Sequence, residues 1–354
     1  MAEQFEVEKA NFAKHQVRTS PEQALADGEV RVKIDFFAFT ANNLTYAVAG
    51  DMLGYWQFFP ASAPEQGMIP VWGFADVIES NSAEVAVGER IYGYLPPASE
   101  LVLKPMKVKG DSWFDASDHR QSLPPLYNRY LRLEPKSEEA KQREIGQALL
   151  GPLYMTGYLL YDMLKENQYF GAEQVVVVSA SSKTSIGLAY ALSQDESPTV
   201  VGLTSAGNKE FVAALGYYES VATYDALDGL EDRPTVIVDM AGNGELVDQM
   251  KSRLGENLKY FVRVGITHWE QQSANPMDSN DNETFFFAPS YMLERSEASP
   301  GFAQIVQEFV ATGAQESLAW MELKNLDGVQ GLASVYDDMC AGKVSPKLGL
   351  ICMM

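Results

Sequence analysis

The chain of 354 residues carries 27 Lys and Arg against 48 Asp and Glu, which gives a formal net charge of −21 at pH 7. Hydrophobic residues make up 46% of it, as in ordinary globular proteins, and the length corresponds to about two domains. An acidic surface repels phosphate backbones and anionic lipids, which argues against binding to nucleic acid or to a membrane surface.

The cysteine count and the hydropathy pattern bear on the compartment. Two cysteines, Cys340 and Cys352, are too few for a disulfide framework and indicate a reducing environment. The acidic first residues lack the basic and apolar regions of a secretory signal, and no apolar run approaches the roughly 18 residues of a membrane helix. These observations predict a cytoplasmic protein.

The first 110 residues are predicted to be rich in β-strands. Residues 29–39 alternate charged and apolar side chains, as a half-buried strand does, and residues 72–80 and 91–96 are two further predicted strands. Short strands separated by Gly and Pro are typical of a partly open barrel or a sandwich.

From about residue 138 the pattern changes to alternating helices and strands. Residues 137–167 have a helical period, with a break expected near Gly151-Pro152. Four consecutive valines within 174–180 indicate a strand that is buried on both faces of a parallel sheet. Further helices and strands are predicted at 185–192, 199–205, 206–216, 218–225, 235–242, 245–255 and 259–265. This alternation predicts a doubly wound sheet of the kind that binds nucleotides.

The order of elements resembles the medium-chain dehydrogenase/reductase superfamily, and within it the zinc-independent quinone-oxidoreductase branch. The stretches that carry the resemblance are 71–80 with 85–96, LYMTGYLLYDML at 153–164, and the helix, Gly-Lys turn and last strand of 333–351. The resemblance implies an α/β protein and a homodimer. It places a GroES-like catalytic domain at 1–148, completed by 291–354, and a Rossmann dinucleotide-binding domain with a doubly wound parallel sheet at 149–290.

The chain departs from the zinc-dependent members of that superfamily. Trp72-Gly73-Phe74 occupies the position where those members keep a metal-binding His. The three histidines, His15, His119 and His268, lack the spacing of metal ligands. We therefore expect no metal site, and the resemblance implies reduction of a quinone or of a polarised double bond.

The loop after the first strand of the predicted parallel sheet is the expected place for a pyrophosphate. From Ser179 to Gly187 it has hydroxyls and a lysine in place of the usual glycines, and such groups also bind phosphate, although an ordinary capping turn is the alternative. The second strand ends in Thr204-Ser205 without an acidic residue before Glu210, which favours NADPH over NADH. The predicted cofactor-binding residues, several of them by resemblance, are Thr156, Ser181, Ser182, Lys183, Thr184, Gly187, Thr204, Ser205, Lys209, Tyr224, Ala241, Gly265 and Phe287.

The predicted substrate side lies in the first domain. By resemblance, Asn42 and Tyr46 lie at the mouth of the active site, where a phenol would hydrogen-bond a carbonyl or donate a proton. The aromatic residues Tyr55, Trp56 and Phe59 predict a flat apolar pocket. Core packing is the alternative for all four aromatic residues. Residues 115–119 are expected to form a solvent-facing loop.

The sequence therefore predicts a zinc-independent, NADPH-dependent reductase that transfers hydride to a quinone or to an activated C=C substrate. One alternative is a non-catalytic NADPH-sensing or scaffold protein with the same fold. Another is an enoyl-thioester reductase, for which Lys104, Lys107 and Lys109 would contact an anionic carrier group unless they form only a solvated loop.

Overall fold

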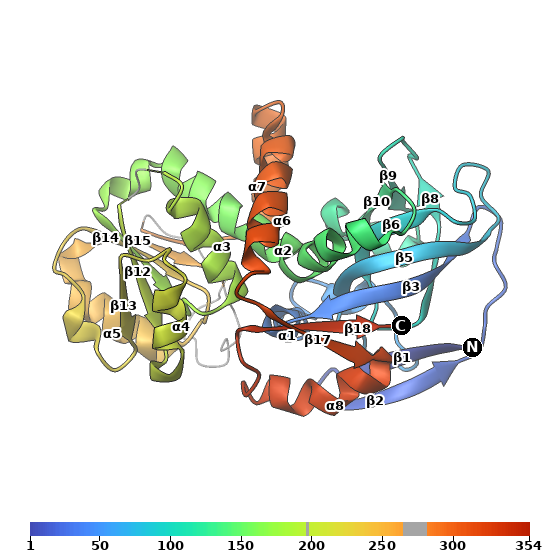
Figure 1. Cartoon of the computed structure of the whole chain (residues 1–354), viewed down its shortest axis with the longest axis horizontal. Coiled ribbons are helices and arrows are strands. Elements are labelled where there is room, and N and C mark those ends of the chain that lie inside the picture. The colour runs from blue at the N-terminus through green and yellow to red at the C-terminus, as the bar shows by residue number, and fades with distance from the viewer. Residues whose placement is uncertain (196–197, 265–281) are drawn as a thin grey trace. The chain divides into compact units, whose positions relative to one another are not determined.

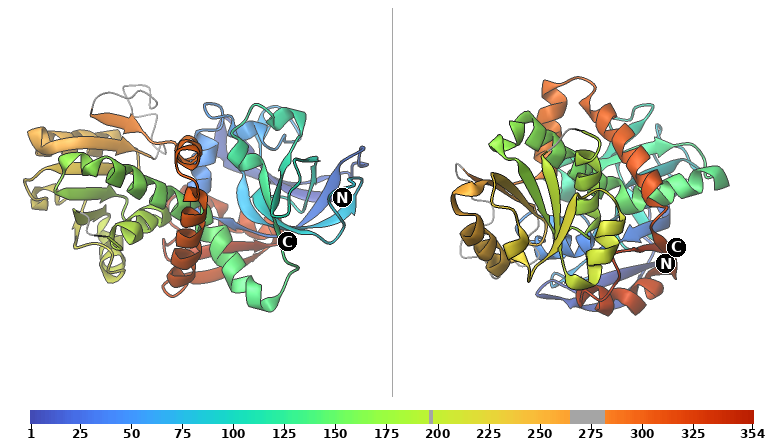
Figure 2. Two further views of the ribbon diagram at one scale, coloured as in Figure 1. Left: turned by 90° about the horizontal axis from the view of Figure 1, so that it is seen from above. Right: turned by 60° about the vertical axis from the view of Figure 1, so that its left-hand side comes forward.

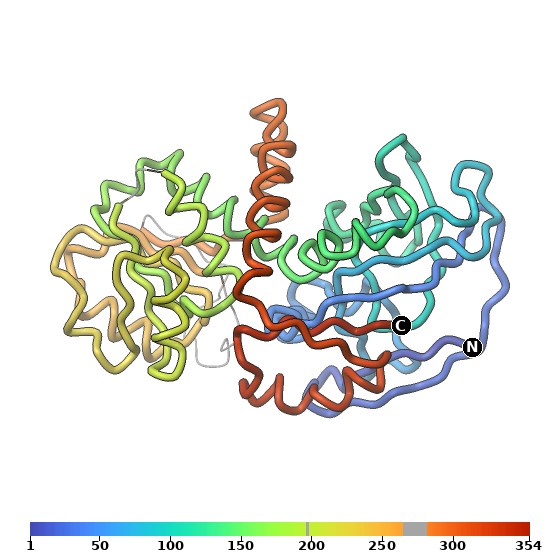
Figure 3. Tube along the Cα trace, viewed as in Figure 1, coloured from blue at the N-terminus to red at the C-terminus, as the bar shows by residue number. Residues whose placement is uncertain are grey.

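A computed structural model describes residues 1–195, 198–264 and 282–354. The chain divides into two compact units (Figure 1): unit 1 contains Met1–Leu149 and Met321–Met354, and unit 2 contains Leu150–Trp320. Both ends of the chain belong to unit 1, as the trace in Figure 3 shows. Within the described residues, no helix is long and apolar enough to cross a membrane.

Unit 1 is built on β-sheets, which confirms the predicted β-rich domain. Its larger sheet has the order β17-β18-β3-β5-β6-β10-β9-β8, with β7 paired to β3, and a smaller sheet has the order β2-β1-β4. The strands are β1 (Ala2–Glu8), β2 (Asn11–Ser20), β3 (Val30–Phe39), β4 (Gln66–Gly67), β5 (Val71–Ser80), β6 (Arg90–Leu95), β7 (Glu100–Leu103), β8 (Pro105–Met106), β9 (Ser112–Asp115), β10 (Arg129–Leu133), β17 (Glu322–Asp327) and β18 (Leu348–Met353). The helices that lie wholly within this unit are α1 (Ala41–Val48) and α8 (Gly328–Cys340).

A buried ion network joins the strands of unit 1 to the first half of helix α2 (Glu138–Glu166). The Arg90 guanidinium is fully buried and donates hydrogen bonds to Glu144 (2.7 Å), Asp76 (3.0 Å) and Asp35 (2.9 Å). Buried charges persist in proteins when they are paired in this way. Arg90, the first residue of β6, is therefore a buried cation that links β6 to β3, β5 and α2.

Helix α2 is continuous through Pro152, so the break predicted there is wrong. Proline removes only one backbone donor, and tertiary packing often outweighs the cost of a proline within a helix. Leu153, Tyr154, Leu159 and Leu160 of this helix are all buried. The division between the two units falls within this helix, after Leu149.

Unit 2 contains a parallel sheet in the order β13-β12-β11-β14-β15-β16. Its strands are β11 (Gln174–Val178), β12 (Thr199–Thr204), β13 (Ser220–Thr223), β14 (Thr235–Asp239), β15 (Leu258–Arg263) and β16 (Glu283–Phe285). The order runs outward in both directions from the first strand, β11, as in classic dinucleotide-binding folds. The predicted doubly wound α/β fold is thereby confirmed.

Helices cover both faces of this sheet (Figure 2). Because strand side chains alternate, Val175 and Val177 pack with α2, α3, α4 and α7, whereas Val176 and Val178 pack with α5. The helices are α3 (Lys183–Leu192), α4 (Lys209–Ala214), α5 (Gly244–Leu254), α6 (Ala288–Ala298) and α7 (Phe302–Ser317). The run of valines in β11 thus has a partner layer on each side.

Helices α6 and α7 pack within unit 2, whereas the sequence assigned everything after residue 290 to the first domain. Arg295 of α6 donates to Asp162 of α2 at 2.6 Å, and Tyr154 of α2 lies 2.5 Å from the Ser317 hydroxyl. These polar contacts and the buried Phe302 explain why the compact unit extends to Trp320. The predicted domain functions stay predictions.

Candidate functional site

The loop between β11 and α3 is a tight, hydroxyl-rich turn. Ser179, directly after β11, has φ of +57°, a left-handed conformation that glycine adopts more easily. The Ser182 side chain caps α3 by accepting a hydrogen bond from the Ser185 amide at 3.2 Å. The serines thus form the turn that the predicted site requires, and α3 begins directly after it.

Gly187 serves the packing of α3 against α2. A Cβ atom at Gly187 would lie 2.2 Å from Cδ1 of Tyr154, and one at Gly157 would lie 2.5 Å from the Leu188 nitrogen. The last glycine of dinucleotide-binding loops likewise allows the helix to pack closely against the adjacent element. Gly187 therefore supports the loop through close packing of the two helices.

Lys183 is the first residue of α3, and its place there is electrostatically unusual. Burial lowers the pKa of its ammonium group to about 8. The N-terminus of a helix also carries partial positive charge, so it favours anions and disfavours a further cation. A negative charge near Lys183 would favour its charged form.

Side chains from the ends of β11, β12 and β13 meet at one edge of the sheet. The Ser181 hydroxyl accepts hydrogen bonds from Thr204 Oγ1 (3.3 Å) and Asn208 Nδ2 (3.1 Å). The hydroxyls of Ser179 and Tyr224 lie 3.3 Å apart. The structure thus brings Ser181, Thr204 and Tyr224 into one polar cluster, as parallel strands that end together would do.

Ser205 and Lys209 are exposed beside this cluster, and they have an acidic neighbour that the sequence analysis missed. A hydrogen bond from Thr223, reinforced by the charge of Lys209, lowers the pKa of Asp225. Thr223 pairs with Thr204 across the sheet, so the residues that follow each of them lie near one another. Asp225 would reduce the net attraction of this edge for a ribose phosphate.

The other predicted cofactor residues lie elsewhere in unit 2. Ala241 follows β14 in a turn whose amides at 241 and 242 donate to the buried Asp239 carboxylate, at 2.8 and 3.0 Å. Phe287 is half-buried at the start of α6, and the Thr156 hydroxyl donates to the Pro152 carbonyl at 2.9 Å within α2. Gly265 lies outside the described residues.

In unit 1, α1 positions the predicted catalytic pair. Thr40 and Asn43 form a capping box at the start of α1, and the buried Asn43 side chain donates to the Pro70 carbonyl at 2.9 Å. Tyr46 follows on the same short helix. Its hydroxyl accepts a hydrogen bond from the Trp72 indole nitrogen at 3.3 Å and is hydrogen-bonded by the Asn42 side chain.

The environment of Tyr46 keeps its phenol protonated. Burial raises its pKa to about 12, although the hydrogen bonds from Trp72 and Asn42 act in the opposite direction. Its ring packs against Tyr55 and Tyr94, with centroids 4.7 and 5.5 Å away. At neutral pH the side chain is therefore a hydrogen-bond donor set in an aromatic cluster.

The three aromatic residues predicted for the substrate pocket have different surroundings. Tyr55 lies in the cluster, with its hydroxyl 3.1 Å from that of Tyr127. Trp56 is packed between two glycines, since a Cβ at Gly50 would lie 2.1 Å from its indole nitrogen. Phe59 lines a cavity of about 400 Å³ that neither Tyr55 nor Trp56 borders. For Trp56, therefore, core packing accounts for the position of the side chain better than a substrate pocket does.

The segment expected to form a solvent-facing loop is exposed at Asp118 and His119, as expected, but the expectation is wrong for Asp115. Asp115 ends β9, is buried, and forms an ion pair with the buried Arg120 at 3.2 Å. His119 lies between them in the chain, and its Nε2 is 3.2 Å from the Phe58 carbonyl.

As for metals, no group of three or more His, Cys, Asp or Glu side chains in the described parts of the chain is placed to hold an ion. His268 lies outside those parts.

Comparison with solved structures gives full-length likenesses at low identity. CurA from Vibrio vulnificus in complex with NADPH is 13% identical, with a TM-score of 0.61 and 99% of each chain covered. A quinone oxidoreductase from Coxiella burnetii is 12% identical, with a TM-score of 0.57, and covers 100% of this chain and 99% of its own. A mutant enoyl thioester reductase from Candida tropicalis is 13% identical, with a TM-score of 0.60 and the same coverage.

These likenesses show that the chain shares the fold of these reductase structures, which confirms the predicted fold. A search of curated proteins found no significant match. The family model described as "Protein of unknown function (DUF2855)" matches residues 37–345, most of the chain. The chain belongs to the DUF2855 family.

Proposed function

We propose that the protein is a zinc-independent, NADPH-dependent reductase that transfers hydride to a quinone or to an activated C=C bond. The observation that carries the proposal is the likeness along the whole chain to oxidoreductase structures, one of them a complex with NADPH. The hydroxyl-rich turn after β11 supports it, because it stands where this sheet order places a pyrophosphate.

The residues at this edge of the sheet fit a phosphorylated dinucleotide. Ser181, Ser182 and Thr184 offer hydroxyls, and Lys183 offers an ammonium group, all of which bind phosphate. Lys209 would pair with the 2′-phosphate of NADPH. No carboxylate ends β12, and Asp225, which follows β13, would offset only part of this attraction. When bound, NADPH would supply the hydride.

Tyr46 would act on the substrate. A phenol that stays protonated at neutral pH and accepts hydrogen bonds from Trp72 and Asn42 would donate its proton toward a carbonyl oxygen. This donation would polarise the conjugated double bond and favour arrival of the hydride. Asn42 would hold the phenol in orientation.

The test is the oxidation of NADPH, followed by its absorbance, with a panel of enones and quinones. We expect turnover with at least one class, and a fall of about 10²-fold in kcat for Tyr46→Phe, the size typical of a general acid. Tyr161→Phe, a change at a tyrosine on α2 that bonds Asp195, is the matched control and leaves kcat unchanged. NADPH binding without any turnover would instead support the non-catalytic alternative.

An enoyl-thioester reductase is the second candidate, since a Candida tropicalis enzyme of that name has this fold. Lys104, Lys107 and Lys109 are exposed around β8 and would meet the phosphates of a thioester carrier. Replacing Lys104 and Lys107 by Ala would then raise KM for crotonyl-CoA while leaving KM for a simple enone unchanged. An unaltered thioester KM would count against this candidate.

A further inference from the structure

Trp72 of β5 directs its indole N–H at the phenol that the proposed function uses as an acid. Its Nε1–H donates to the Tyr46 hydroxyl at 3.3 Å, and both side chains are buried, with 8% and 7% of their surface exposed. An indole nitrogen donates a hydrogen bond and cannot accept one. The proton of the phenol must therefore be donated to a partner other than Trp72.

The sheet and the rings around Trp72 hold the indole in this orientation. Trp72 pairs with Tyr94 of β6, so the two side chains share one face of the sheet, with ring centroids 5.2 Å apart. Tyr92 also contacts the indole, at 5.7 Å. Gly73 fixes the strand, because a Cβ there would lie 2.4 Å from the Phe36 carbonyl oxygen of β3. An indole held on these sides cannot turn away from the phenol without disturbing the core.

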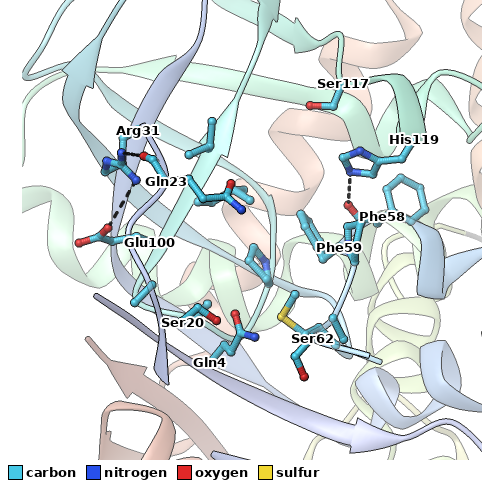
Figure 4. A pocket seen from close by; sticks show the side chains of 18 of the residues that line it. Gln4, Ser20, Gln23, Arg31, Phe58, Phe59, Ser62, Glu100, Ser117 and His119 are labelled. Carbon is cyan, nitrogen blue, oxygen red and sulfur yellow. Dashed lines mark hydrogen bonds and ion pairs between the residues drawn. The ribbon is translucent and has the colours of Figure 1, made fainter. Parts of the chain in front are cut away.

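The cavity of about 400 Å³ in unit 1 does not reach this pair. Phe58 and Phe59 line it, as Figure 4 shows, whereas Tyr46 and Trp72 do not. The ring of Phe58 also packs against Tyr94, with centroids 5.2 Å apart. The hydrogen bond from Trp72 is thus made inside an aromatic core, where such a bond is electrostatically stronger than in water.

We propose that Trp72 is a positioning residue for the reductase reaction, and that its N–H holds the Tyr46 oxygen so that the phenol proton is directed to the carbonyl oxygen of the substrate. The role rests on the proposed function, in which Tyr46 donates that proton. The O–H bond of Tyr46 breaks and a new O–H bond forms on the substrate, while the hydride that arrives at the β-carbon supplies the electron pair.

The bond from Trp72 strengthens during this step. Negative charge develops on the Tyr46 oxygen as its proton leaves, and a hydrogen bond to a charged oxygen is about twice as strong as one to a neutral oxygen. An interaction that is stronger in the transition state than in the bound ground state raises kcat and has little effect on KM. Loss of the indole N–H should therefore lower kcat alone.

The first test is a double-mutant cycle in NADPH oxidation with the best substrate of the enone and quinone panel. Trp72→Phe keeps a ring in the core and removes the N–H, and we expect kcat to fall about tenfold with KM unchanged. In the Tyr46→Phe background the same change should cost nothing further, because Trp72 acts through the phenol. Trp113→Phe is the matched control, since Trp113 is fully buried and its indole nitrogen has no hydrogen-bond partner among the described residues. It should leave kcat and KM unchanged.

The second readout does not require turnover. The chain has five tryptophans, and the indole N–H signals of the ¹⁵N-labelled protein report on each of them separately by NMR. Tyr46→Phe keeps the aromatic ring and removes the hydroxyl. We therefore expect the Trp72 indole proton to shift upfield in this variant, because it loses its acceptor, while the Trp113 signal stays in place.

An unmoved Trp72 signal would overturn the proposal. So would an unchanged kcat in Trp72→Phe, or a loss as large in the Tyr46→Phe background as in the wild type, which would mark a purely structural role. The NMR comparison leaves Trp72 in place, so it decides even if Trp72→Phe fails to fold. A wild type that reduces no member of the panel would overturn the proposed function and the role of Trp72 together, whereas an unmoved signal beside normal turnover would overturn the role of Trp72 alone.

Discussion

The half-buried lysine at the start of α3 makes a quantitative prediction. The pKa of Lys183 falls from the ordinary value of 10.5 to about 8 because burial disfavours the charged form. At 1.36 kcal/mol for each tenfold change, this fall corresponds to about 3 kcal/mol of unfavourable free energy at neutral pH. Groups with a perturbed pKa cluster at functional sites, so Lys183 is a candidate contact for a bound anion.

Lys183→Met removes the charge and keeps most of the side-chain volume. Since methionine will fill the space imperfectly, we expect the ligand-free protein to gain about 1–2 kcal/mol of stability at pH 7, part of the full cost. A group whose pKa is lowered on folding destabilises fully below the folded-state pKa, and the cost fades as pH rises toward the unfolded-state value. The gain should therefore shrink between pH 8 and pH 10.

Urea unfolding of wild type and variant at pH 7 and pH 9.5, without NADPH, measures this effect. The exposed Lys209→Met is the control and should change stability little at either pH. Titration with NADPH should show weaker binding by Lys183→Met than by the wild type, because the variant loses a phosphate partner. A variant that is less stable than the wild type at pH 7, or that binds NADPH equally well, would refute the reasoning.

Three further predictions follow from the packing and the charges. Gly187→Ala would force a Cβ to within 2.2 Å of Tyr154 and should cost about 1–3 kcal/mol in chemical unfolding, whereas Gly229→Ala, with nothing within 4 Å, should cost little; equal effects would contradict the packing argument. NADPH affinity of the wild type should fall as pH rises above about 8, where Lys183 loses its proton, and Lys183→Met should flatten that profile. Arg90→Met would leave three carboxylates without their shared partner and should destabilise unit 1 by about 3–5 kcal/mol in thermal unfolding; a shift in Tm of less than 2 °C would argue against that network.

The parallel sheet could be predicted from sequence because its evidence is local. The valines of β11 are apolar on both faces, and each following strand has its own apolar run. The hairpin of β1 and β2 was missed, since β2 is mostly exposed and polar, and its stability comes from pairing with β1. The continuous path of α2 through Pro152 likewise depends on packing partners distant in sequence.

The candidate site was predicted where residues follow directly from strand ends. Ser181, Thr204 and Tyr224 meet because β11, β12 and β13 end at one edge. Asp225 was missed because its proximity to Lys209 depends on the register between β12 and β13. The buried pair of Asp115 and Arg120 was missed because nothing in a polar stretch indicates burial. The predicted homodimer, the absence of zinc and the cytoplasmic location stay predictions.

We propose that the edge of the sheet in unit 2 binds NADPH through its 2′-phosphate. Calorimetric titration of the protein with NADPH and NADH side by side, repeated for Lys209→Ala, tests it most directly. We expect tighter binding of NADPH, with the preference reduced at least tenfold in Lys209→Ala and NADH binding unchanged. Binding of neither nucleotide, or equal affinity for both, would contradict it.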